Sequence, residues 1–541
     1  MGQDGTSAAL DVTVTRPTGA AGAVRLSATG VPSGVNVTFT DPGLTNTGKV
    51  TLASQSTAAG TYNVLIFASD GVSSGSAPLA IVVAVVAKVQ PASPAKLHFF
   101  MSTSFQPANW SYRIFQDHPN AASLLDQLQP QHVRIQAVYD GIPATSATTW
   151  NFNTLDAILQ PVLGVADHSP EFQVVIPSYM LDSTGKPRDP TYQEYAAYAA
   201  NLVRYYNKGG FTANGSLLRS PANIPIQWWG IFNEPNINSV NAASYTQLYN
   251  LTVPVMQGVD PTLRFAAVEL ADFGNEPQNF LPTFVAGVTA KVDALATHYY
   301  GSCNQKDSDQ QVFAAVATFV AHVRYIRSAL QANPALAGVP VWVTENNVNA
   351  DFAGANGQSV CNPGTPFVTD ARGSSAFFAA WRPYVLSQLA QAGAQALYHW
   401  DFNADAQYGE IDGSAKVLLS YWVDYWLSRS FSVLPDPDIL TVSATETSTT
   451  EVFAMRRATG AVLIMVVDRA IANAADNNGP GAPRTVTLDL ASLGLFTSAS
   501  LLTIDASTNL TTGPVATAVP PAQRMDVTLN GYGVAFVTLT P

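Results

Sequence analysis

The sequence predicts a multidomain protein in which a (β/α)8 TIM barrel is flanked by an N-terminal and a C-terminal β-sandwich. Closely spaced short strands occupy the start of the chain, and they give way to strands that alternate with helices. The helical pattern ends near residue 434. Alternating strands and helices are typical of a parallel sheet, and short strands with Gly- and Pro-containing turns are typical of sandwiches. We therefore expect sandwiches at residues 1–88 and 434–541, a linker at 89–95 and the barrel at 96–433.

The first 88 residues contain strand-like runs separated by turns, and no cluster of catalytic residue types. The runs are Leu10–Arg16, Ala23–Thr29, Val35–Thr40, Lys49–Ala53, Thr61–Ala68 and Ala77–Ala87. Within them, the segments Gly30–Phe39 and Gly60–Val64 resemble bacterial immunoglobulin-like modules. We favour a spacer role for this module, with glycan binding as the alternative.

Eight short apolar strands alternate with helical stretches in the central region, which is the pattern of a barrel of parallel β/α units. They are Lys96–Ser102, His132–Val138, Phe172–Pro177, Ile226–Phe232, Arg264–Glu269, Val292–His298, Val339–Glu345 and Ala396–Trp400. Three helices have capping-box signals, in which two side chains satisfy otherwise unpaired N–H groups. The pairs are Thr191 with Glu194, Ser244 with Gln247 and Ser308 with Gln311.

The region after residue 434 again contains only strand-like runs, and packing against the barrel is its expected role. The runs are Ile439–Ala444, Glu451–Met455, Ala461–Val467, Thr485–Leu490, Ser500–Thr503, Arg524–Leu529 and Val534–Leu539. The segment Asn473–Arg484, rich in Asn, Gly and Pro, is expected to be a long exposed loop.

Composition excludes two classes of partner. The formal net charge is −12 and no basic cluster is present, so nucleic acid is not an expected partner. No stretch reaches the roughly 18 to 20 apolar residues that a membrane span requires. The N-terminus lacks the basic and apolar regions of an export signal, so we expect that any signal peptide is absent from this chain. The oligomeric state is not predicted.

The two cysteines, Cys303 and Cys361, each follow a predicted barrel strand. In the predicted barrel their loops are neighbours on one face, so we expect a disulfide, with two unreactive thiols as the alternative. A ring of this size stabilises a protein by about 4 kcal/mol in the loop-closure model. A disulfide favours an oxidising compartment, and we therefore expect a secreted or periplasmic bacterial protein.

Two strands of the predicted barrel deliver a glutamate to their C-terminal end. Ile226–Phe232 is followed by Glu234 and Pro235, and Val339–Glu345 ends in Glu345. Partial burial beside aromatic rings disfavours the charged form of a carboxyl group, which suits a general acid at neutral pH. Two carboxylates at the C-terminal face of a barrel are the minimum equipment for glycoside hydrolysis. The alternative for each is a carboxylate satisfied at a strand end.

Four segments on the expected strands, in order, carry a family resemblance. They are Val133-Arg134-Ile135, Asn233-Glu234-Pro235-Asn236, Asp293–Tyr300 and Thr344-Glu345-Asn346. Together they resemble glycoside hydrolase family 39, within clan A of the retaining glycosidases. The resemblance covers residues 96–433 and extends to the C-terminal sandwich, but not to residues 1–88.

The resemblance implies a double displacement through a glycosyl-enzyme. Glu345 would be the nucleophile, kept ionised by hydrogen bonds from its neighbours. Glu234 would protonate the leaving oxygen and then deprotonate the incoming water. In such retaining enzymes the two carboxyl groups lie about 5–5.5 Å apart.

The resemblance also assigns substrate-binding roles. Asn233 would hydrogen-bond the sugar 2-hydroxyl, and Arg134 would orient the nucleophile; a strand-end cap and a structural ion pair are the respective alternatives. His298 and Tyr300 would lie near the nucleophile, and Trp400 would stack on sugar, with core packing as the alternative. For Trp228 and Trp229 we favour core packing.

One position departs from the family pattern. Xylosidases of the family tend to read Arg-Phe-His-Gly on the second strand, whereas this chain reads Arg134-Ile135-Gln136-Ala137. Gln136 thus stands where the family has a His that contacts sugar, so the reaction class carries over but the sugar does not.

Other carboxylates near predicted strand ends are rivals for a role in the site. They are Asp140, Glu269, Asp272, Asp401, Asp405 and Glu410. Only Glu269 is considered as a substitute nucleophile. No His/Cys/Asp cluster has metal-ligand spacing and no Gly-rich phosphate motif is present, so no metal or cofactor is expected.

The sequence therefore predicts a retaining β-glycoside hydrolase with a carbohydrate substrate. A β-xylosidase-like exo action is favoured, because the long segment 346–374 could close one end of the site. The alternatives are an endo-acting β-glycanase on a plant or microbial polysaccharide and, with less support, a catalytically inactive glycan-binding protein. The presence of Glu234, Glu345 and Arg134 argues against the inactive form.

Overall fold

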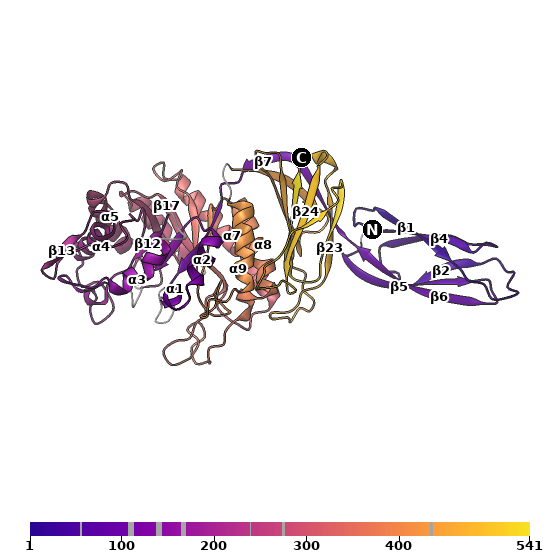
Figure 1. Ribbon diagram of the computed structural model, residues 1–541, viewed down its shortest axis with the longest axis horizontal. Helices are drawn as coiled ribbons and strands as arrows, with labels where there is room; N and C mark the ends of the chain where they lie inside the picture. The colour runs from indigo at the N-terminus through magenta and orange to yellow at the C-terminus, as the bar shows by residue number, and fades with distance from the viewer. Residues whose placement is uncertain are drawn as a thin grey trace.

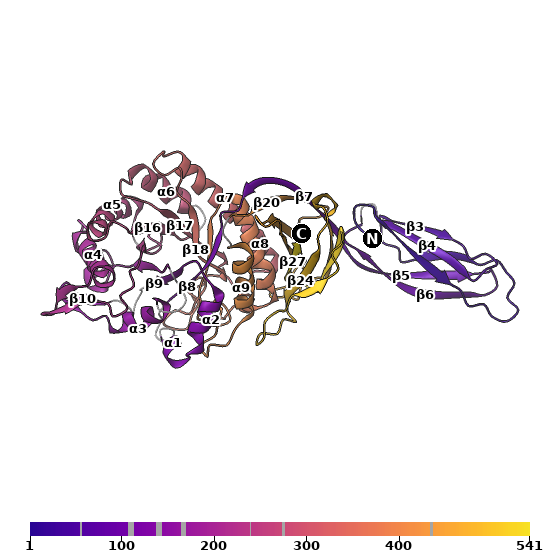
Figure 2. The ribbon, with the colours of Figure 1, turned by 45° about the horizontal axis from the view of Figure 1, so that its top comes forward.

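The computed structural model has three parts in a row (Figure 1): the barrel domain, a C-terminal β-sheet domain and the N-terminal module. Figure 2, turned by 45°, shows the same order, so the C-terminal domain lies between the other two. The structure describes residues 1–54, 57–106, 113–136, 143–163, 169–238, 240–272, 276–432 and 436–541.

The N-terminal module consists of two three-stranded antiparallel sheets, with strand orders β1-β4-β3 and β2-β5-β6. The strands are β1 (Ser7–Thr13), β2 (Arg25–Thr29), β3 (Val35–Thr40), β4 (Thr47–Ser54), β5 (Gly60–Ser69) and β6 (Ser74–Val83). Val50 and Leu52 of one sheet pack against Val64, Ile66 and Ile81 of the other. The module is therefore the predicted β-sandwich.

Strand β7 (Val85–Lys96) departs from the predicted linker at residues 89–95. It pairs antiparallel with β20 (Asp438–Ala444) and parallel with β23 (Arg484–Asp489). The pairing partners step from Gln90↔Thr441 to Ala95↔Ile439, so the two prolines of the segment fall in a bulge. Proline cannot donate to a ladder and is tolerated at bulges, which is why a Pro-containing segment can belong to a strand.

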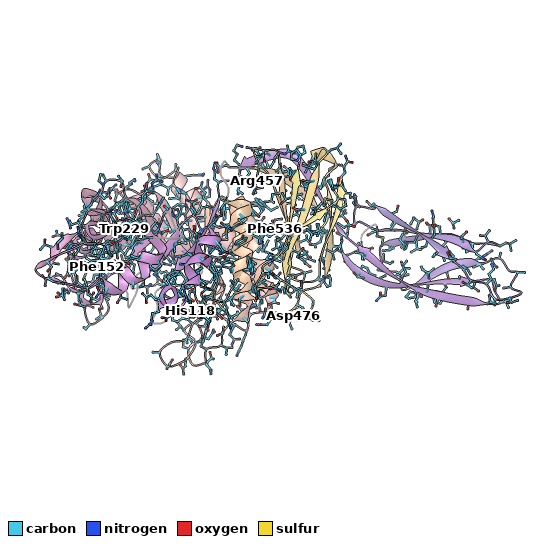
Figure 3. The ribbon with its side chains drawn as sticks, in the orientation of Figure 1. His118, Phe152, Trp229, Arg457, Asp476 and Phe536 are labelled. Carbon is cyan, nitrogen blue, oxygen red and sulfur yellow. A yellow bond between two sulfur atoms is a disulfide. The ribbon has the colours of Figure 1, made fainter. Side chains whose placement is uncertain are left out.

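The predicted C-terminal sandwich is one continuous sheet of nine strands, in the order β25-β24-β27-β22-β21-β20-β7-β23-β26. Its other strands are β21 (Thr450–Arg456), β22 (Val462–Asp468), β24 (Ser498–Asp505), β25 (Thr517–Val519), β26 (Arg524–Leu529) and β27 (Gly533–Thr540). In β22, Ile464 and Val466 face the core of the curled sheet, whereas Met465 and Val467 face the barrel domain. Both faces are thus buried, and Figure 3 shows Phe536 between the sheet and the helices.

The central region forms a closed barrel with the order β12-β15-β16-β17-β18-β19-β8-β9, so all eight predicted strands are confirmed. They are β8 (Phe100–Phe105), β9 (Val133–Gln136), β12 (Glu171–Val174), β15 (Trp228–Ile231), β16 (Arg264–Leu270), β17 (Ala294–Ser302), β18 (Val341–Asn349) and β19 (Ala396–His399). Two short hairpins are added, β10 (Ala144–Ser146) with β11 (Thr149–Trp150) and β13 (Phe211–Ala213) with β14 (Ser216–Leu218).

Helices surround the barrel, and α8 and α9 stand between it and the C-terminal sheet (Figure 1). The helices are α1 (Ile114–Asp117), α2 (Asn120–Leu128), α3 (Asn153–Pro161), α4 (Gln193–Asn207), α5 (Ala242–Val259), α6 (Glu276–Gly287), α7 (Asp309–Gln331), α8 (Ala376–Ala392) and α9 (Leu419–Phe431). Short 3-10 turns are η4 (Ser178–Met180), η5 (Ala371–Ser374) and η6 (Ala491–Leu493). None of the helices that the structure describes is both long and apolar enough to cross a membrane.

Of the three predicted capping boxes, that of Ser308 and Gln311 at the start of α7 is confirmed. The other two are wrong. The Asp189 carboxylate accepts from the N–H groups of Thr191 and Glu194, ahead of α4. Asn241 caps α5 by accepting from the Ser244 N–H. In both cases an Asx side chain upstream takes the N–H groups that the predicted box would have used.

The N-terminal end of the barrel interior is apolar and aromatic. Trp228, Trp342, Tyr398 and two alanines form a cluster there, with Phe100 packed against it. Trp229 points the other way, into the main hydrophobic core between strands and helices. Core packing is therefore the role of both tryptophans, and the buried His132 ring packs against the same aromatic cluster.

Candidate active site

Glu234 and Glu345 lie at the same end of the barrel, where one carboxylate oxygen of each and a ring nitrogen of His298 are all within 4.8 Å of one another. Glu234 follows β15, and the chain turns there through left-handed conformations at Phe232 (φ 68°) and Glu234 (φ 46°). Such conformations are uncommon for residues with side chains and cluster at functional sites.

Glu345 is not the last residue of its strand, contrary to the predicted bounds. β18 continues to Asn349 and stays paired with β17 as far as Ser302, whereas its recorded pairs with β19 are confined to Trp342 and Val343. The paired strands β17 and β18 thus extend past the other strands of the barrel. Their register places His298 beside Glu345.

Two donors hold the Glu345 carboxylate. Arg134, fully buried on β9, donates from Nη1 to Oε1 at 2.9 Å, and the Tyr300 hydroxyl donates to Oε2 at 2.8 Å. Burial nonetheless raises the pKa of the Glu345 carboxyl above its ordinary value, although His298, Arg134 and Tyr300 oppose the shift. The neighbours stabilise the ionised form, but burial and the charge of Glu234 outweigh them.

His298 connects three carboxylates. Its Nδ1 lies 2.9 Å from Glu234 Oε1 and 3.4 Å from Glu345 Oε2. Its Nε2 lies 3.0 Å from Glu269 Oε2. Burial by itself would lower the pKa of His298, but the facing carboxylates outweigh it and raise the pKa to about 9. The imidazole is therefore charged at neutral pH and donates on both sides.

Asn233 is oriented by two donors. Arg134 Nη2 and Gln173 Nε2 each donate to its Oδ1 at 3.0 Å. Its Nδ2 makes no hydrogen bond within the described part of the chain, and the side chain is only partly buried. The amide is thus held with its donor group free for a hydroxyl acceptor.

Gln136 and Trp400 line the same end of the barrel. Trp400 is buried at the end of β19, and the Arg134 guanidinium lies 6.0 Å from its ring centroid. Gln136 is buried beside Gln173 on the neighbouring strand, and its Oε1 has no hydrogen-bond partner among the residues described. All the predicted site residues are thus brought to one end of the barrel.

Sequence reasoning missed two residues, Gln173 and Glu171 on β12. Both side chains point into the barrel, Gln173 toward Asn233 and Glu171 toward the Tyr398 hydroxyl. The available signal was polar residues at alternate positions of a buried strand, but the predicted strand began one residue late, at Phe172.

The rival carboxylates do not reach the position of a nucleophile. Glu269 is fully buried and its Oε2 accepts from Thr344 at 2.6 Å. Asp272 contacts His322 of α7, and Glu410 accepts from Thr103 at 2.7 Å. Asp401 is buried, which raises the pKa of its carboxyl well above the ordinary value. Asp405 caps the following turn at Gln407, and Asp140 lies outside the described residues.

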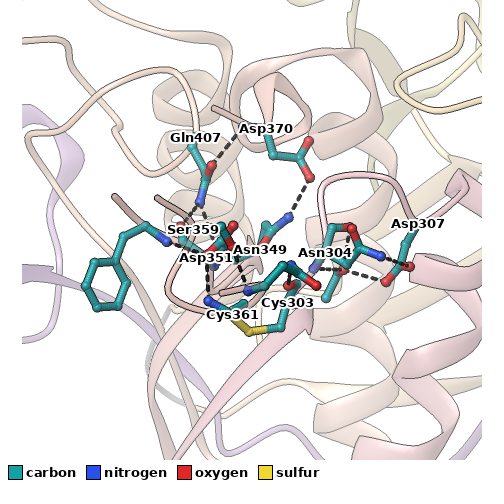
Figure 4. The surroundings of a disulfide bond; sticks show 12 residues. Cys303, Asn304, Asp307, Asn349, Asp351, Ser359, Cys361, Asp370 and Gln407 are labelled. Carbon is teal, nitrogen blue, oxygen red and sulfur yellow. Dashed lines mark hydrogen bonds between the residues drawn. A yellow bond between two sulfur atoms is a disulfide. The ribbon is translucent and has the colours of Figure 1, made fainter. Parts of the chain in front are cut away.

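A disulfide joins Cys303 and Cys361, as predicted, and links the segments that follow β17 and β18 (Figure 4). Asp351 accepts from the Cys361 N–H at 2.9 Å, and its carbonyl accepts from Gln407 and from the Tyr408 hydroxyl at 2.6 Å. The Tyr408 ring lies 6.5 Å from that of Tyr300. The disulfide therefore braces a wall beside the site.

Two sets of side chains among the described residues bring three potential metal-ligand atoms close together. They are Glu234 with His298 and Glu345, and His399 with Glu410 and Asp424. In the first set the same atoms are engaged in hydrogen bonds, and the charged Arg134 and His298 repel a cation. Arg382 has the same effect on the second set through its ion pair with Asp424.

No protein-family model and no curated protein matches the chain. Several solved structures resemble it in fold. A monomeric beta-xylosidase from Caulobacter crescentus CB15 has a TM-score of 0.60 and 16% identity, over 85% of this chain and 100% of that chain. A GH51 arabinofuranosidase from Xanthomonas axonopodis pv. citri has a TM-score of 0.59 and 12% identity, over 84% and 100%. The catalytic domain of GH30 xylanase C from Talaromyces cellulolyticus has a TM-score of 0.55 and 14% identity, over 84% and 100%.

Proposed function

We propose that the protein is a retaining O-glycoside hydrolase that acts on β-linked oligo- or polysaccharide. The observation that carries the proposal is the approach of Glu234 and Glu345 to within 4.8 Å, oxygen to oxygen. Retaining pairs lie about 5–5.5 Å apart, whereas inverting pairs lie about 6.5–9.5 Å apart to admit a water between them. The solved structures of similar fold, whose titles name a xylosidase, an arabinofuranosidase and a xylanase, support the same class.

In the first step Glu345 attacks the anomeric carbon while Glu234 gives its proton to the leaving oxygen, so the glycosidic bond breaks and a glycosyl-enzyme forms. In the second step Glu234 takes a proton from water while the water oxygen attacks the anomeric carbon. The bond from that carbon to Glu345 breaks, and the free sugar and the Glu345 carboxylate result. Arg134 and Tyr300 hold the nucleophile. Asn233 is placed to hydrogen-bond the sugar 2-hydroxyl, and Trp400 offers a stacking surface.

We favour β-xylosidase-like exo action and membership of glycoside hydrolase family 39, on the four strand motifs. The wall braced by the disulfide supports exo action, because a closed side limits the site to a chain end. An endo-acting β-glycanase is the alternative. A catalytically inactive glycan-binding protein has less support, since Glu234, Glu345 and Arg134 are all in place.

Secretion or a periplasmic location fits the disulfide, because such bonds persist in oxidising compartments. The N-terminal module fits an immunoglobulin-like spacer, because it projects from the C-terminal domain away from the barrel (Figure 2).

The test is hydrolysis of a panel of aryl β-glycosides and of xylan, β-glucan and mannan, by the wild type, Glu345→Ala and Glu234→Ala. Azide should rescue both variants. Glu345→Ala should give the α-glycosyl azide by direct displacement, and Glu234→Ala should give the β-glycosyl azide through the glycosyl-enzyme. Release of single sugars supports exo action, and internal cleavage of polymers alone supports endo action. Full activity of Glu345→Ala, or absence of turnover by the wild type, would overturn the proposal.

A further inference from the structure

Glu269 is a buried carboxylate that the proposed reaction leaves without a role. The backbone of β16 is left-handed at Val268 (φ 81°) and Glu269 (φ 48°), and its pairing with β17 shifts between Ala267 and Leu270. This bulge turns the Glu269 side chain into the barrel. Gly230 on β15 leaves room for this side chain, because a Cβ atom at that position would lie 3.0 Å from Glu269 Oε1.

One oxygen of Glu269 receives two hydrogen bonds and one ion pair, from side chains of three different strands. Oε2 lies 3.0 Å from His298 Nε2, 3.3 Å from Arg134 Nη2 and 2.6 Å from Thr344 Oγ1. Glu269 is fully buried, and His298 and Arg134 each contact both Glu269 and a catalytic glutamate.

Glu269 also contacts a second carboxyl group, that of Glu171. Glu269 Oε1 and Glu171 Oε1 are both buried and receive no donor from the residues described. The two carboxyl groups are in hydrogen-bond contact, and the Tyr398 hydroxyl donates to Glu171 Oε2 at 2.9 Å. A single proton on Glu171, donated to Glu269, turns this contact into a hydrogen bond, whereas two adjacent buried carboxylates would repel.

The protonation pattern agrees with that geometry. Burial, together with the charge on Glu269, raises the pKa of Glu171 to about 8. Burial also acts on Glu269, but Arg134 and His298 outweigh it and lower the pKa of the Glu269 carboxyl. At neutral pH the pair is therefore one acid and one carboxylate.

We propose that Glu269 is a positioning residue which, with Glu171 as its neutral partner, holds His298 as an imidazolium between the acid/base and the nucleophile. The proposal rests on the proposed roles of Glu234 and Glu345. The proposal adds a buried carboxyl pair, Glu171 with Glu269, to the catalytic pair of Glu234 and Glu345.

The chemical benefit follows from how charge moves in the reaction. Formation of the glycosyl-enzyme neutralises Glu345 and leaves Glu234 as a carboxylate. His298 Nδ1 lies within 2.9 Å and 3.4 Å of oxygens of these two groups, so a fixed cation compensates the negative charge before and after the transfer. No reorganisation is needed at the moment of reaction, which is the condition under which electrostatic stabilisation is most effective.

The titratable groups that face His298, Glu269 and Glu171 together set the charges of these three side chains. His298 faces Glu234, Glu345 and Glu269 from three neighbouring elements. Glu269 faces Arg134 and His298, and Glu171 on its other side. Tyr300 and Tyr398 act on Glu345 and Glu171 as neutral hydroxyl donors, because burial raises the pKa of both tyrosines well above the ordinary value.

The test compares Glu269→Gln with Glu410→Gln, the same exchange at a buried carboxyl outside the site. Because Glu269 does not touch substrate, Glu269→Gln should lower kcat by about 10- to 100-fold with little change in KM. Its kcat should also decline as pH rises through neutrality, because His298 loses its proton earlier. Glu410→Gln should keep the kcat and pH profile of the wild type.

An NMR titration of the imidazole nitrogens tests the proposal independently of turnover, with His298→Gln used for assignment. His298 should titrate near pH 9 in the wild type and well below that in Glu269→Gln. In Glu171→Gln the amide still donates to Glu269, so His298 should keep its raised pKa.

Titration of wild-type His298 near its ordinary value would overturn the proposal, whether or not Glu269→Gln folds. So would an unchanged His298 titration in Glu269→Gln, or equal changes in Glu410→Gln. Absence of glycosidase activity combined with the expected titrations would instead overturn the proposed function and leave the positioning of His298 intact.

Discussion

Among the described residues of the barrel domain, two buried clusters each join an arginine, a histidine and carboxylates. The first, the site cluster, comprises Arg134, His298, Glu234, Glu269 and Glu345. The second, the sealed cluster, comprises Arg382, His399, Glu410 and Asp424, where β19 meets helices α8 and α9. Arg382 donates to Asp424 at 2.9 Å, and His399 Nδ1 lies 2.8 Å from the same carboxylate.

The two histidines differ in what surrounds them. His298 faces three carboxylates, and its pKa is raised to about 9. His399 is hydrogen-bonded to one carboxylate, that of Asp424, and to the Tyr408 carbonyl, and burial together with the nearby Arg382 charge lowers its pKa. The site cluster also reaches solvent through the Glu234 side chain, which is 19% exposed, whereas every member of the sealed cluster is buried. The two clusters contain the same types of residue. They differ in the number of carboxylates around the histidine and in whether solvent reaches the cluster.

The largest expected effect is on turnover. Glu345→Gln removes the proposed nucleophile and should reduce kcat by at least about 1,000-fold, or roughly 4 kcal/mol of barrier. Asp424→Asn in the sealed cluster should leave kcat of the folded protein within a few-fold of the wild type. Steady-state kinetics on an aryl β-glycoside measures both. Equal losses in the two variants would remove the distinction between the clusters.

The next effect is on stability. Arg382→Met leaves Asp424 buried without its cation, and breaking such a pair costs about 3–5 kcal/mol. Guanidinium denaturation should show a lower midpoint, while kcat per folded molecule is retained. Arg134→Met should lose both stability and activity. A retained midpoint in Arg382→Met would mean that the sealed cluster is not held by its ion pair.

A smaller effect is expected for a single hydrogen bond to the nucleophile. Tyr300→Phe removes the 2.8 Å donor to Glu345 and should lower kcat by about 10- to 100-fold, the size expected for a bond to a charged group. Tyr421→Phe removes a 3.0 Å bond to the Leu124 carbonyl, away from the site, and should change only the melting temperature. Activity unchanged in Tyr300→Phe would exclude Tyr300 from orienting the nucleophile.

The smallest expected effect is on the pH dependence of stability, with opposite signs at the two histidines. The pKa of His298 is raised to about 9 from an ordinary 6.5, so its contribution is complete below pH 6.5 and is lost as pH rises toward 9. The pKa of His399 is lowered, so the folded state favours the neutral ring and loses stability as pH falls below 6.5.

Melting temperatures measured from pH 5 to 10 should therefore show a weaker alkaline decline in His298→Gln than in the wild type. His399→Gln should weaken the acidic decline instead. Parallel curves for either variant and the wild type would contradict the corresponding sign.

The sequence was sufficient to locate the two glutamates of the proposed catalytic pair and the disulfide. Glu234 and Glu345 stand beside apolar strands, and Cys303 and Cys361 stand in loops that a barrel makes neighbours, so local patterns and topology located all four. The barrel strands were equally visible, because each is a short apolar run between helical stretches.

Local sequence patterns did not predict the buried contacts beneath the site or the sealed cluster. Polar and apolar residues alternate in β12, but the predicted strand began at Phe172, and no local pattern indicates that Glu171 meets Glu269 of another strand. The sealed cluster was missed because His399, Glu410 and Asp424 come together only when helix α9 packs on the barrel. Their motif is spatial, with no local spacing to detect.

Strand β7 has a consequence for the order in which the protein is made. Its end is joined to β20 across 342 residues, through the Lys96–Asp438 pair, and the whole barrel lies between the two partners. During synthesis from the N-terminus, β7 emerges well before either strand that flanks it. The N-terminal module and the barrel can each complete their hydrogen bonding before β7 has a strand paired to either of its edges. The strands that pair with both edges of β7 thus become available only when residues 438–489 have been synthesised.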